Sequence, residues 1–150
     1  MLAARWHGRK DVRVEDIPEV GPPPEGWVKV KVAWCGLCGT DLEEYLHGPV
    51  LIPTEPHPLS GRKAPLTMGH EISGEVVEVG RGVRHLREGD RVGLENSAFC
   101  GHCYWCSHHY PHLCEQMVTL GLMADGGFAE YVLAPAVTCV KLPEGMPLDA

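Results

Sequence analysis

The chain has 150 residues, of which 44% are hydrophobic and 22% are charged, and its net charge is −7 at pH 7. This length suits one domain with its own hydrophobic core, and the acidic balance excludes binding to a nucleic-acid backbone, which requires a basic face. The sequence contains no apolar run long enough to span a membrane and no signal-peptide pattern at its N-terminus. We therefore expect a cytoplasmic protein whose thiols stay reduced.

The N-terminal part of the chain predicts β-strands. Residues 1–8 and 11–17 are expected to form paired strands separated by a charged turn, and residues 11–17 alternate apolar and polar side chains. After the rigid break GPPPEG, residues 27–36 have the clearest period-two pattern of the chain, with three valines on one face. We therefore expect three strands before residue 37.

One short helix and a long loop are predicted next. Within residues 40–46, Leu42, Tyr45 and Leu46 recur three to four positions apart, which is the spacing of an apolar helix face. The proline-rich stretch 48–67 predicts a long ordered loop.

The second half of the chain returns to strand patterns around an irregular lobe. The expected strands are 71–80, 90–95, 126–135 and 137–143, and the lobe covers about 96–116. Eighteen glycines and thirteen prolines also favour short strands joined by turns. The fold class that we predict is mainly β, a barrel or a sandwich, in one domain over residues 1–150.

The lobe holds four of the seven cysteines, in the spacing Cys-x2-Cys-x2-Cys-x7-Cys. They are Cys100, Cys103, Cys106 and Cys114. Ligands this close together require an irregular loop that folds around a small ion, and tetrahedral Zn²⁺ with four thiolates fits this spacing. A closed shell of four sulfurs leaves no position for a substrate, so we predict a structural zinc site whose binding energy helps to fold the lobe.

Three other interpretations of the lobe carry less weight. The bacterial iron–sulfur pattern continues with its fourth cysteine after three residues and then proline, whereas here the gap is seven residues and Glu115 follows. Disulfides are rare in the reducing compartment that we expect. His102, His108, His109 and His112 could each replace a cysteine, but four thiolates already complete the shell, so we expect solvated histidines.

A second group of residues has the composition of a different metal site. Cys35 and Cys38 lie in CGLCGTD, and His70 and Glu71 lie in GHEISGEVVEVGRGV. Composition alone favours a histidine at a turn and a solvated carboxylate. The alternative is a zinc site with few protein ligands and a position left open for water or substrate.

The order of these motifs resembles the zinc-dependent medium-chain alcohol dehydrogenases. Gly69, His70 and Glu71 are followed by Gly74, Gly80 and Val83 in that family's spacing, and CGLCGTDLEEY, the cysteine lobe and GGFAEYV match three further segments in order. The resemblance runs from about residue 27 to residue 143. It implies a GroES-like, partly open β-barrel with short helices and a zinc lobe. Within the family, EYLHGPVLIP, HPLSG and LTMGHE are most similar to butanediol and acetoin dehydrogenases, near the sorbitol dehydrogenases.

The resemblance also implies roles for single residues. Cys38, His70 and Glu71 match the ligands of the catalytic zinc, and Cys35 does not. Thr40 matches the hydroxyl that relays the substrate proton, and Asp41 matches the carboxylate that orients His70. These matches make Thr40 and Glu71 catalytic residues as well.

Three residues near these motifs stand outside this assignment. At Glu43 many relatives have a histidine that ends the proton relay, so Glu43 is either a substitute proton acceptor or a solvated helix residue. Cys35 and Cys139 are expected to be small buried apolar residues in strands.

The sequence contains no G-x-G-x-x-G motif for binding a nicotinamide cofactor. The nearest match, GRGVRH from Gly80, has the first two glycines and lacks the third. The resemblance implies a Rossmann domain for NAD or NADP that follows residue 150, and a homo-oligomer for the longer protein. We expect residues 1–150 alone to fold, to hold structural zinc and not to turn over alcohols.

The expected function is therefore the catalytic portion of a zinc-dependent alcohol dehydrogenase that oxidises a small secondary alcohol or diol to a ketone. The alternatives are a sorbitol or threonine dehydrogenase within the family, or a non-enzymatic zinc-binding module of the same fold.

Overall fold

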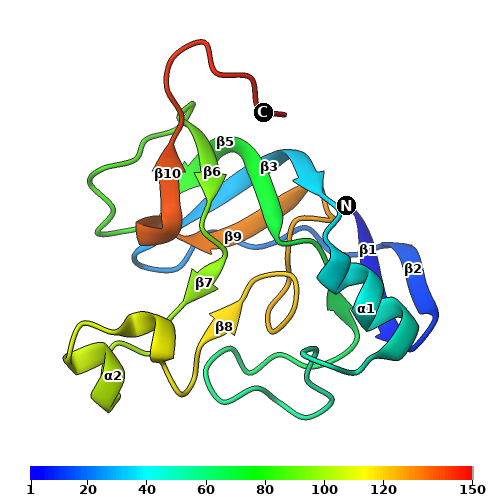
Figure 1. The fold of residues 1–150 in the computed structure, drawn as a ribbon. Coiled ribbons are helices and arrows are strands. Elements are labelled where there is room, and N and C mark those ends of the chain that lie inside the picture. Colours follow the sequence, from blue (N-terminus) through cyan, green and yellow to red (C-terminus); the bar gives the residue numbers. More distant parts are fainter. Residues whose placement is uncertain (150) are drawn as a thin grey trace.

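The computed structural model describes residues 1–149 and is mainly β. Its strands are Leu2–Gly8 (β1), Asp11–Asp16 (β2), Trp27–Gly36 (β3), Leu66–Thr67 (β4), Glu71–Val79 (β5), Arg91–Leu94 (β6), Ser97–Ala98 (β7), Val118–Thr119 (β8), Tyr131–Pro135 (β9) and Cys139–Lys141 (β10). Its helices are Gly39–His47 (α1) and Tyr104–Ser107 (α2), with 3-10 turns at Pro111–Leu113 (η1) and Ala136–Thr138 (η2). Figure 1 shows the strands wrapped around a common centre, with α1 on one side and α2 in a lobe that projects from the other.

The main sheet has five strands in the order β10-β6-β5-β3-β9. Its edge strands β9 and β10 are consecutive in the chain and joined by η2, so the sheet curls back towards itself. This is the partly open barrel that the motifs predict. Every ladder between named strands in residues 1–149 is antiparallel, so a doubly wound nucleotide-binding unit, which needs parallel strands, does not occur in this range.

Strand β3 forms the centre of the sheet and of the core. Val28 and Val30 pair with β5 and β9 through their backbones, and their side chains are fully buried on one face of the sheet, as their alternation predicts. The alternation fails further along the strand, because the register with β5 shifts between Val32 and Trp34. Val32 is therefore only partly buried and Trp34 is exposed. A bulge of this kind bends the strand, and the bent end leads directly into the loop that carries Cys38.

A second, smaller sheet has the order β2-β1-β4. Its core is a separate cluster around Trp6 and Leu66, whose side chains are almost completely buried. Trp6 Nε1 also donates a hydrogen bond to the carbonyl oxygen of Glu44 in α1, at 3.0 Å. This bond ties α1 to the small sheet, so the helix sits on a rigid support.

Helix α1 confirms the predicted helix and corrects its buried face. The apolar residues Leu42 and Tyr45 are exposed, whereas Asp41 and Glu44 are buried. The physical reason is hydrogen bonding: the Glu44 carboxylate accepts backbone N–H groups from Val50, Leu51 and Ile52. The three hydrogen bonds offset the free-energy cost of removing the Glu44 carboxylate from water, so this helix turns its polar side inward.

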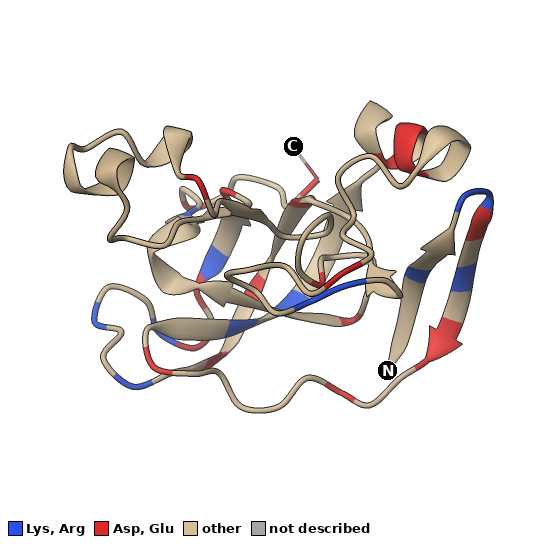
Figure 2. Cartoon of the chain, turned by 90° about the horizontal axis from the view of Figure 1, so that it is seen from below, with Lys and Arg blue, Asp and Glu red and all other residues tan. Residues whose placement is uncertain are grey.

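The predicted loop 48–67 is irregular apart from the two-residue strand β4 at its end. The predicted strand 126–135 begins only at Tyr131, because residues 126–128 bond to residues 67–69 through backbone groups. No helix within residues 1–149 is long and apolar enough to cross a bilayer. Figure 2 shows acidic and basic residues interspersed over the sheets, while the lobe around α2 has almost no charged residue.

Candidate metal centres

Two clusters of metal-ligating side chains form in the structure. One consists of Cys100, Cys103, Cys106 and Cys114, and the other of Cys38, His70 and Glu71. In each cluster the ligand atoms lie within 4.8 Å of one another. Both groups of residues that the sequence singled out are therefore brought together, including members more than thirty residues apart in the second case.

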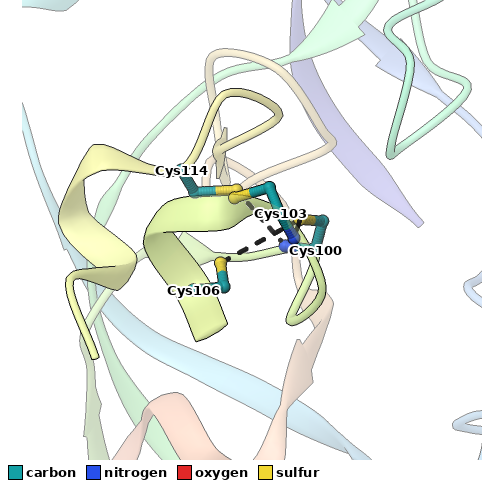
Figure 3. Close-up of side chains that lie close together, drawn as sticks. All are labelled: Cys100, Cys103, Cys106 and Cys114. Atoms are coloured by element: carbon teal, nitrogen blue, oxygen red, sulfur yellow. Dashed lines mark hydrogen bonds between the residues drawn. The ribbon is translucent and has the colours of Figure 1, made fainter. Parts of the chain in front are cut away.

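The four cysteines converge from three short segments of the lobe, as Figure 3 shows. Cys106 lies in α2, Cys103 caps this helix, and the other two lie before α2 and after η1. The Sγ atoms of Cys100 and Cys106 are 3.9 Å apart, close to the roughly 3.8 Å that ligands bonded tetrahedrally at about 2.3 Å would have. Backbone N–H groups of Cys103 and Gln116 point at sulfurs of the cluster at 3.4 Å, which favours thiolates.

The charge of the lobe supports a bound cation. Residues 96–114 contain no Lys or Arg, so the chain segment itself supplies no positive charge for four thiolates. The backbone N–H of Cys106 lowers the pKa of the Cys103 thiol to about 6, whereas desolvation raises the pKa of the Cys106 thiol to about 12. The opposite directions of the pKa shifts mean that the Cys103 and Cys106 thiols do not ionise together by themselves. The donor set fits Zn²⁺, whose charge would stabilise all four thiolates.

The histidines of the lobe lie outside this cluster. His102, His108, His109 and His112 are all exposed, as expected for solvated residues. Two of these histidines make hydrogen bonds to nearby backbone: His102 Nδ1 lies 2.9 Å from the carbonyl oxygen of Cys100, and His108 Nδ1 lies 2.8 Å from that of Tyr104. All seven cysteines are free thiols in the structure.

The second cluster is assembled where β3 ends and β5 begins. Cys38 is the N-cap of α1, immediately after the bent end of β3, and Glu71 is the first residue of β5. Glu71 pairs with Gly36 across the ladder, and a Cβ at residue 36 would collide with the Glu71 carboxylate. Glycine at this position therefore makes room for the carboxylate beside Cys38.

Asp41 and His70 form the buried part of this cluster. Asp41 Oδ1 lies 3.5 Å from His70 Nδ1, and both side chains are less than 10% exposed. Neither of these two atoms has a hydrogen-bond partner within normal distance, while Asp41 Oδ2 accepts the backbone N–H of Cys38 at 3.0 Å. Asp41 thus faces one ring nitrogen of His70 and leaves the other, Nε2, for a metal. A neutral imidazole, a thiolate and a carboxylate are a donor set that zinc accepts.

The other residues near this cluster differ in their relation to it. The Thr40 hydroxyl lies 3.7 Å from Cys38 Sγ, so a hydroxyl group borders the ligand sulfur. Glu43 lies on the exposed side of α1, which agrees with a solvated helix residue. Cys35 and Cys139 are in strands, and burial raises the pKa of each thiol to about 11. Cys139 is buried as expected, whereas Cys35 is only partly buried.

Two residues that hold backbone segments in place through their side chains carry no recognisable signal in the sequence. Glu44 looks like a surface residue of an acidic helix, but its carboxylate is buried and organises the 50–52 segment. Asn96 donates its side-chain N–H to the carbonyl oxygen of His70 at 2.9 Å, across 26 residues of chain. No local spacing marks either residue, because the partner groups are backbone atoms that only the fold brings near.

Comparison with known proteins supports the resemblance seen in the motifs. The family model of the alcohol dehydrogenase GroES-like domain matches residues 24–144. The (R,R)-butanediol dehydrogenase of Bacillus subtilis is 52% identical over 151 residues, which cover 99% of this chain and 42% of that protein.

Solved structures agree. The crystal structure of 2R,3R-butanediol dehydrogenase from Bacillus subtilis superposes with a TM-score of 0.89 at 50% identity, covering 99% of this chain and 42% of that one. The structure of RspB from Escherichia coli, complexed with the cofactor NADH, has a TM-score of 0.81 at 34% identity, covering 99% and 40%. The chain thus spans about two fifths of the length of these relatives. It belongs to the alcohol dehydrogenase GroES-like domain family.

Proposed function

We propose that this chain is the catalytic part of a longer zinc-dependent dehydrogenase that oxidises a small secondary alcohol or vicinal diol, with NAD or NADP as hydride acceptor. The observation that carries the proposal is the cluster of Cys38, His70 and Glu71 with Asp41 behind it. The butanediol dehydrogenase at 52% identity supports a diol of the 2,3-butanediol type, and the NADH complex of RspB supports a nicotinamide.

The residues of the second cluster divide the work of the site. Cys38, His70 and Glu71 would hold a zinc ion, which would supply Lewis-acid polarisation of the alcohol or ketone oxygen. Asp41 faces Nδ1 of His70 at 3.5 Å and would favour a proton there, so that Nε2 presents a lone pair. Thr40 would relay the hydroxyl proton of the substrate by accepting it while giving its own proton to solvent water, because its pKa is too high for it to store a negative charge.

The surface beside this cluster suits a small alkyl substrate. Leu37, which precedes Cys38, is 78% exposed, and Leu42 on α1 is 54% exposed. A cavity of about 630 Å³ reaches Glu71 and is lined by Trp34, Ile72 and Leu94. Apolar side chains next to a polar metal centre bind the carbon skeleton and leave the hydroxyl groups to the centre.

The lobe has a different role in this proposal. Its four cysteines hold a structural zinc, because a shell of four thiolates has no position for a substrate. The lobe has little buried apolar surface of its own, with Cys114 the one buried residue between 100 and 114. The metal therefore replaces a hydrophobic core there.

The first test is the zinc content of residues 1–150, purified without added metal, compared with Cys38→Ser. The proposal predicts two zinc ions per chain and one in the variant. One zinc in both proteins would contradict the second site, and iron with sulfide would contradict the lobe assignment as well.

The second test is turnover by the longer protein. We expect oxidation of 2,3-butanediol with NAD⁺ by the longer protein and none by residues 1–150 alone, with sorbitol and threonine as competing substrates. If the longer protein holds two zinc ions but oxidises none of these three substrates, the result would instead favour a non-enzymatic module.

A further inference from the structure

The base of the cysteine lobe lies directly against the segment that carries His70. Strands β7 and β8 pair where the chain enters and leaves the lobe, and Asn96 is the residue just before β7. Its backbone carbonyl oxygen accepts the N–H of Leu120, just after β8, at 2.9 Å. Asn96 therefore accepts the backbone hydrogen bond that closes the base of the lobe.

The side chain of Asn96 leaves the lobe and reaches the second cluster. Its Nδ2 donates to the carbonyl oxygen of His70 at 2.9 Å, and its Oδ1 accepts the hydroxyl of Ser97 at 3.3 Å. Both the nitrogen and the oxygen of the amide therefore have hydrogen-bond partners, which fixes the orientation of the side chain. One side chain connects the closing bond of the lobe to the backbone of His70.

The chain that leaves the lobe holds the preceding peptide. Gly127 N–H donates to the carbonyl oxygen of Gly69 at 2.8 Å. Gly121 packs so closely on Gly69 that a Cβ there would collide with this carbonyl group. Gly69 itself has φ +90°, a conformation that suits glycine. Two consecutive carbonyl groups are therefore held: that of residue 70 by Asn96 at the lobe base, and that of residue 69 by Gly127 in the chain that follows the lobe.

This arrangement constrains the position of the His70 ring. Asp41 faces the ring at Nδ1 but makes no bond within normal distance to it. The bonds that Asn96 and Gly127 donate to the carbonyl groups of residues 70 and 69 are therefore the tighter constraints on this segment. A metal ligand held by its backbone pays less ordering entropy when the metal binds.

We propose that Asn96 is a positioning residue through which the base of the cysteine lobe holds His70 in place for its metal. The inference rests on the proposed function, because it takes Cys38, His70 and Glu71 as a zinc site. Substitutions of groups behind a metal ligand typically weaken metal binding about 10- to 100-fold. The Asn96 side chain bonds to His70 and Ser97, while its bond to Leu120 uses its backbone, so removal of the amide should weaken the second site and leave the cysteine site unchanged.

The test measures the zinc affinities of residues 1–150 by competition with a chelating indicator. Cys38→Ser retains only the cysteine site and so assigns the two affinities. Asn96→Leu removes the amide at nearly constant volume, and Asn96→Ser removes it without adding bulk, in case the leucine does not fold. Ser97→Ala is the matched control, because it removes the other bond of the amide and leaves the Nδ2 bond to His70.

We expect a dissociation constant about 10- to 100-fold higher at the second site in the Asn96 variants, an unchanged cysteine site, and wild-type values in Ser97→Ala. The absorption of Co²⁺ bound at the second site should change with the same variants. Equal weakening of both sites, or no weakening of either, overturns the role of Asn96. If wild-type protein binds no second zinc, the proposed function fails and this inference with it, and that result appears before any variant is made.

Discussion

Asp41 Oδ1 lies 3.5 Å from His70 Nδ1 at the bottom of the second cluster, with both side chains almost inaccessible to solvent. Asp41 reaches this position because α1 turns its acidic side inward. The same carboxylate accepts the backbone N–H of Cys38 through Oδ2. One residue thus bonds to the backbone of Cys38 and faces the ring of His70, from the first turn of a helix whose N-cap is Cys38.

The substitution Asp41→Asn tests this relationship. The amide oxygen can still accept the Cys38 N–H, but an NH₂ group then faces His70 Nδ1 and no longer favours a proton there. We expect zinc affinity at the second cluster to fall about 10- to 100-fold. Competition with a chelating indicator measures it. Glu43→Gln on the exposed side of the same helix is the control, and equal affinities in the two variants would contradict the role of Asp41.

The buried carboxylate of Glu44 is a stability determinant. Glu44→Gln replaces an ionised acceptor of three backbone N–H groups with an amide whose NH₂ cannot accept. We expect the free energy of unfolding to fall by about 1–3 kcal/mol, measured by urea denaturation of the zinc-loaded chain. The neighbouring Glu43→Gln should stay within about 0.5 kcal/mol of wild type. A similar loss in both variants would mean that helix charge, and not the buried carboxylate, is responsible.

Removal of the lobe metal should have a local effect first. The lobe lacks a core, while β3 and β5 pack in the main hydrophobic cluster. We expect a strong chelator to abolish hydrogen-exchange protection between residues 97 and 119 and to leave the amides of β3 largely protected. Mass spectrometry of peptic fragments resolves the two regions. Simultaneous loss of protection in both would show that the lobe metal is required by the whole domain.

Asp90 gives the stability a defined dependence on pH. Its carboxylate lies 2.9 Å from Lys141 Nζ and accepts the backbone N–H of Arg87 at 2.9 Å. The hydrogen bond from Lys141, more than any other contact, holds the pKa of Asp90 below its ordinary value of 3.8. Because the folded-state pKa is lowered, the stabilisation is complete above the ordinary value and disappears as the pH falls below it.

The substitution Asp90→Asn should therefore lower the free energy of unfolding by about 1 kcal/mol near pH 7, and the difference from wild type should shrink below pH 3.8. Thermal denaturation of both proteins across this range measures the difference. Zinc loss in acid affects both proteins alike and cancels. Glu88→Gln, an exposed acidic residue of the same turn, should show no such pH-dependent difference, and a constant difference for Asp90→Asn would contradict the ion pair.

Much of the fold could be predicted from local patterns. The valines of 27–36 alternate because one face of a strand is buried, and this prediction holds for Val28 and Val30. The same rule fails beyond Val32, because a bulge opposite β5 changes which side chains point inward. A register shift depends on the partner strand, which lies forty residues away in the chain, and no local pattern contains it.

The helix shows the same limit for burial. The spacing of Leu42, Tyr45 and Leu46 predicts an apolar inner face, yet the structure buries Asp41 and Glu44. Spacing reports which residues share a face but not what that face meets. Here it meets three backbone N–H groups and a histidine, so the carboxylates are the better partners.

The sequence was sufficient to predict the cysteine cluster of the lobe, whose donor set fits zinc, because four cysteines within fifteen residues can converge through local turns alone. It also determined the family, through motifs in a fixed order. The tertiary structure alone decided how Cys38, His70 and Glu71 meet, which face of α1 is buried, and that Asn96 reaches His70. These relations join segments that are distant in the chain, through side chains and backbone groups that only the register of the sheet brings together, and so they leave no mark in the local order of side chains.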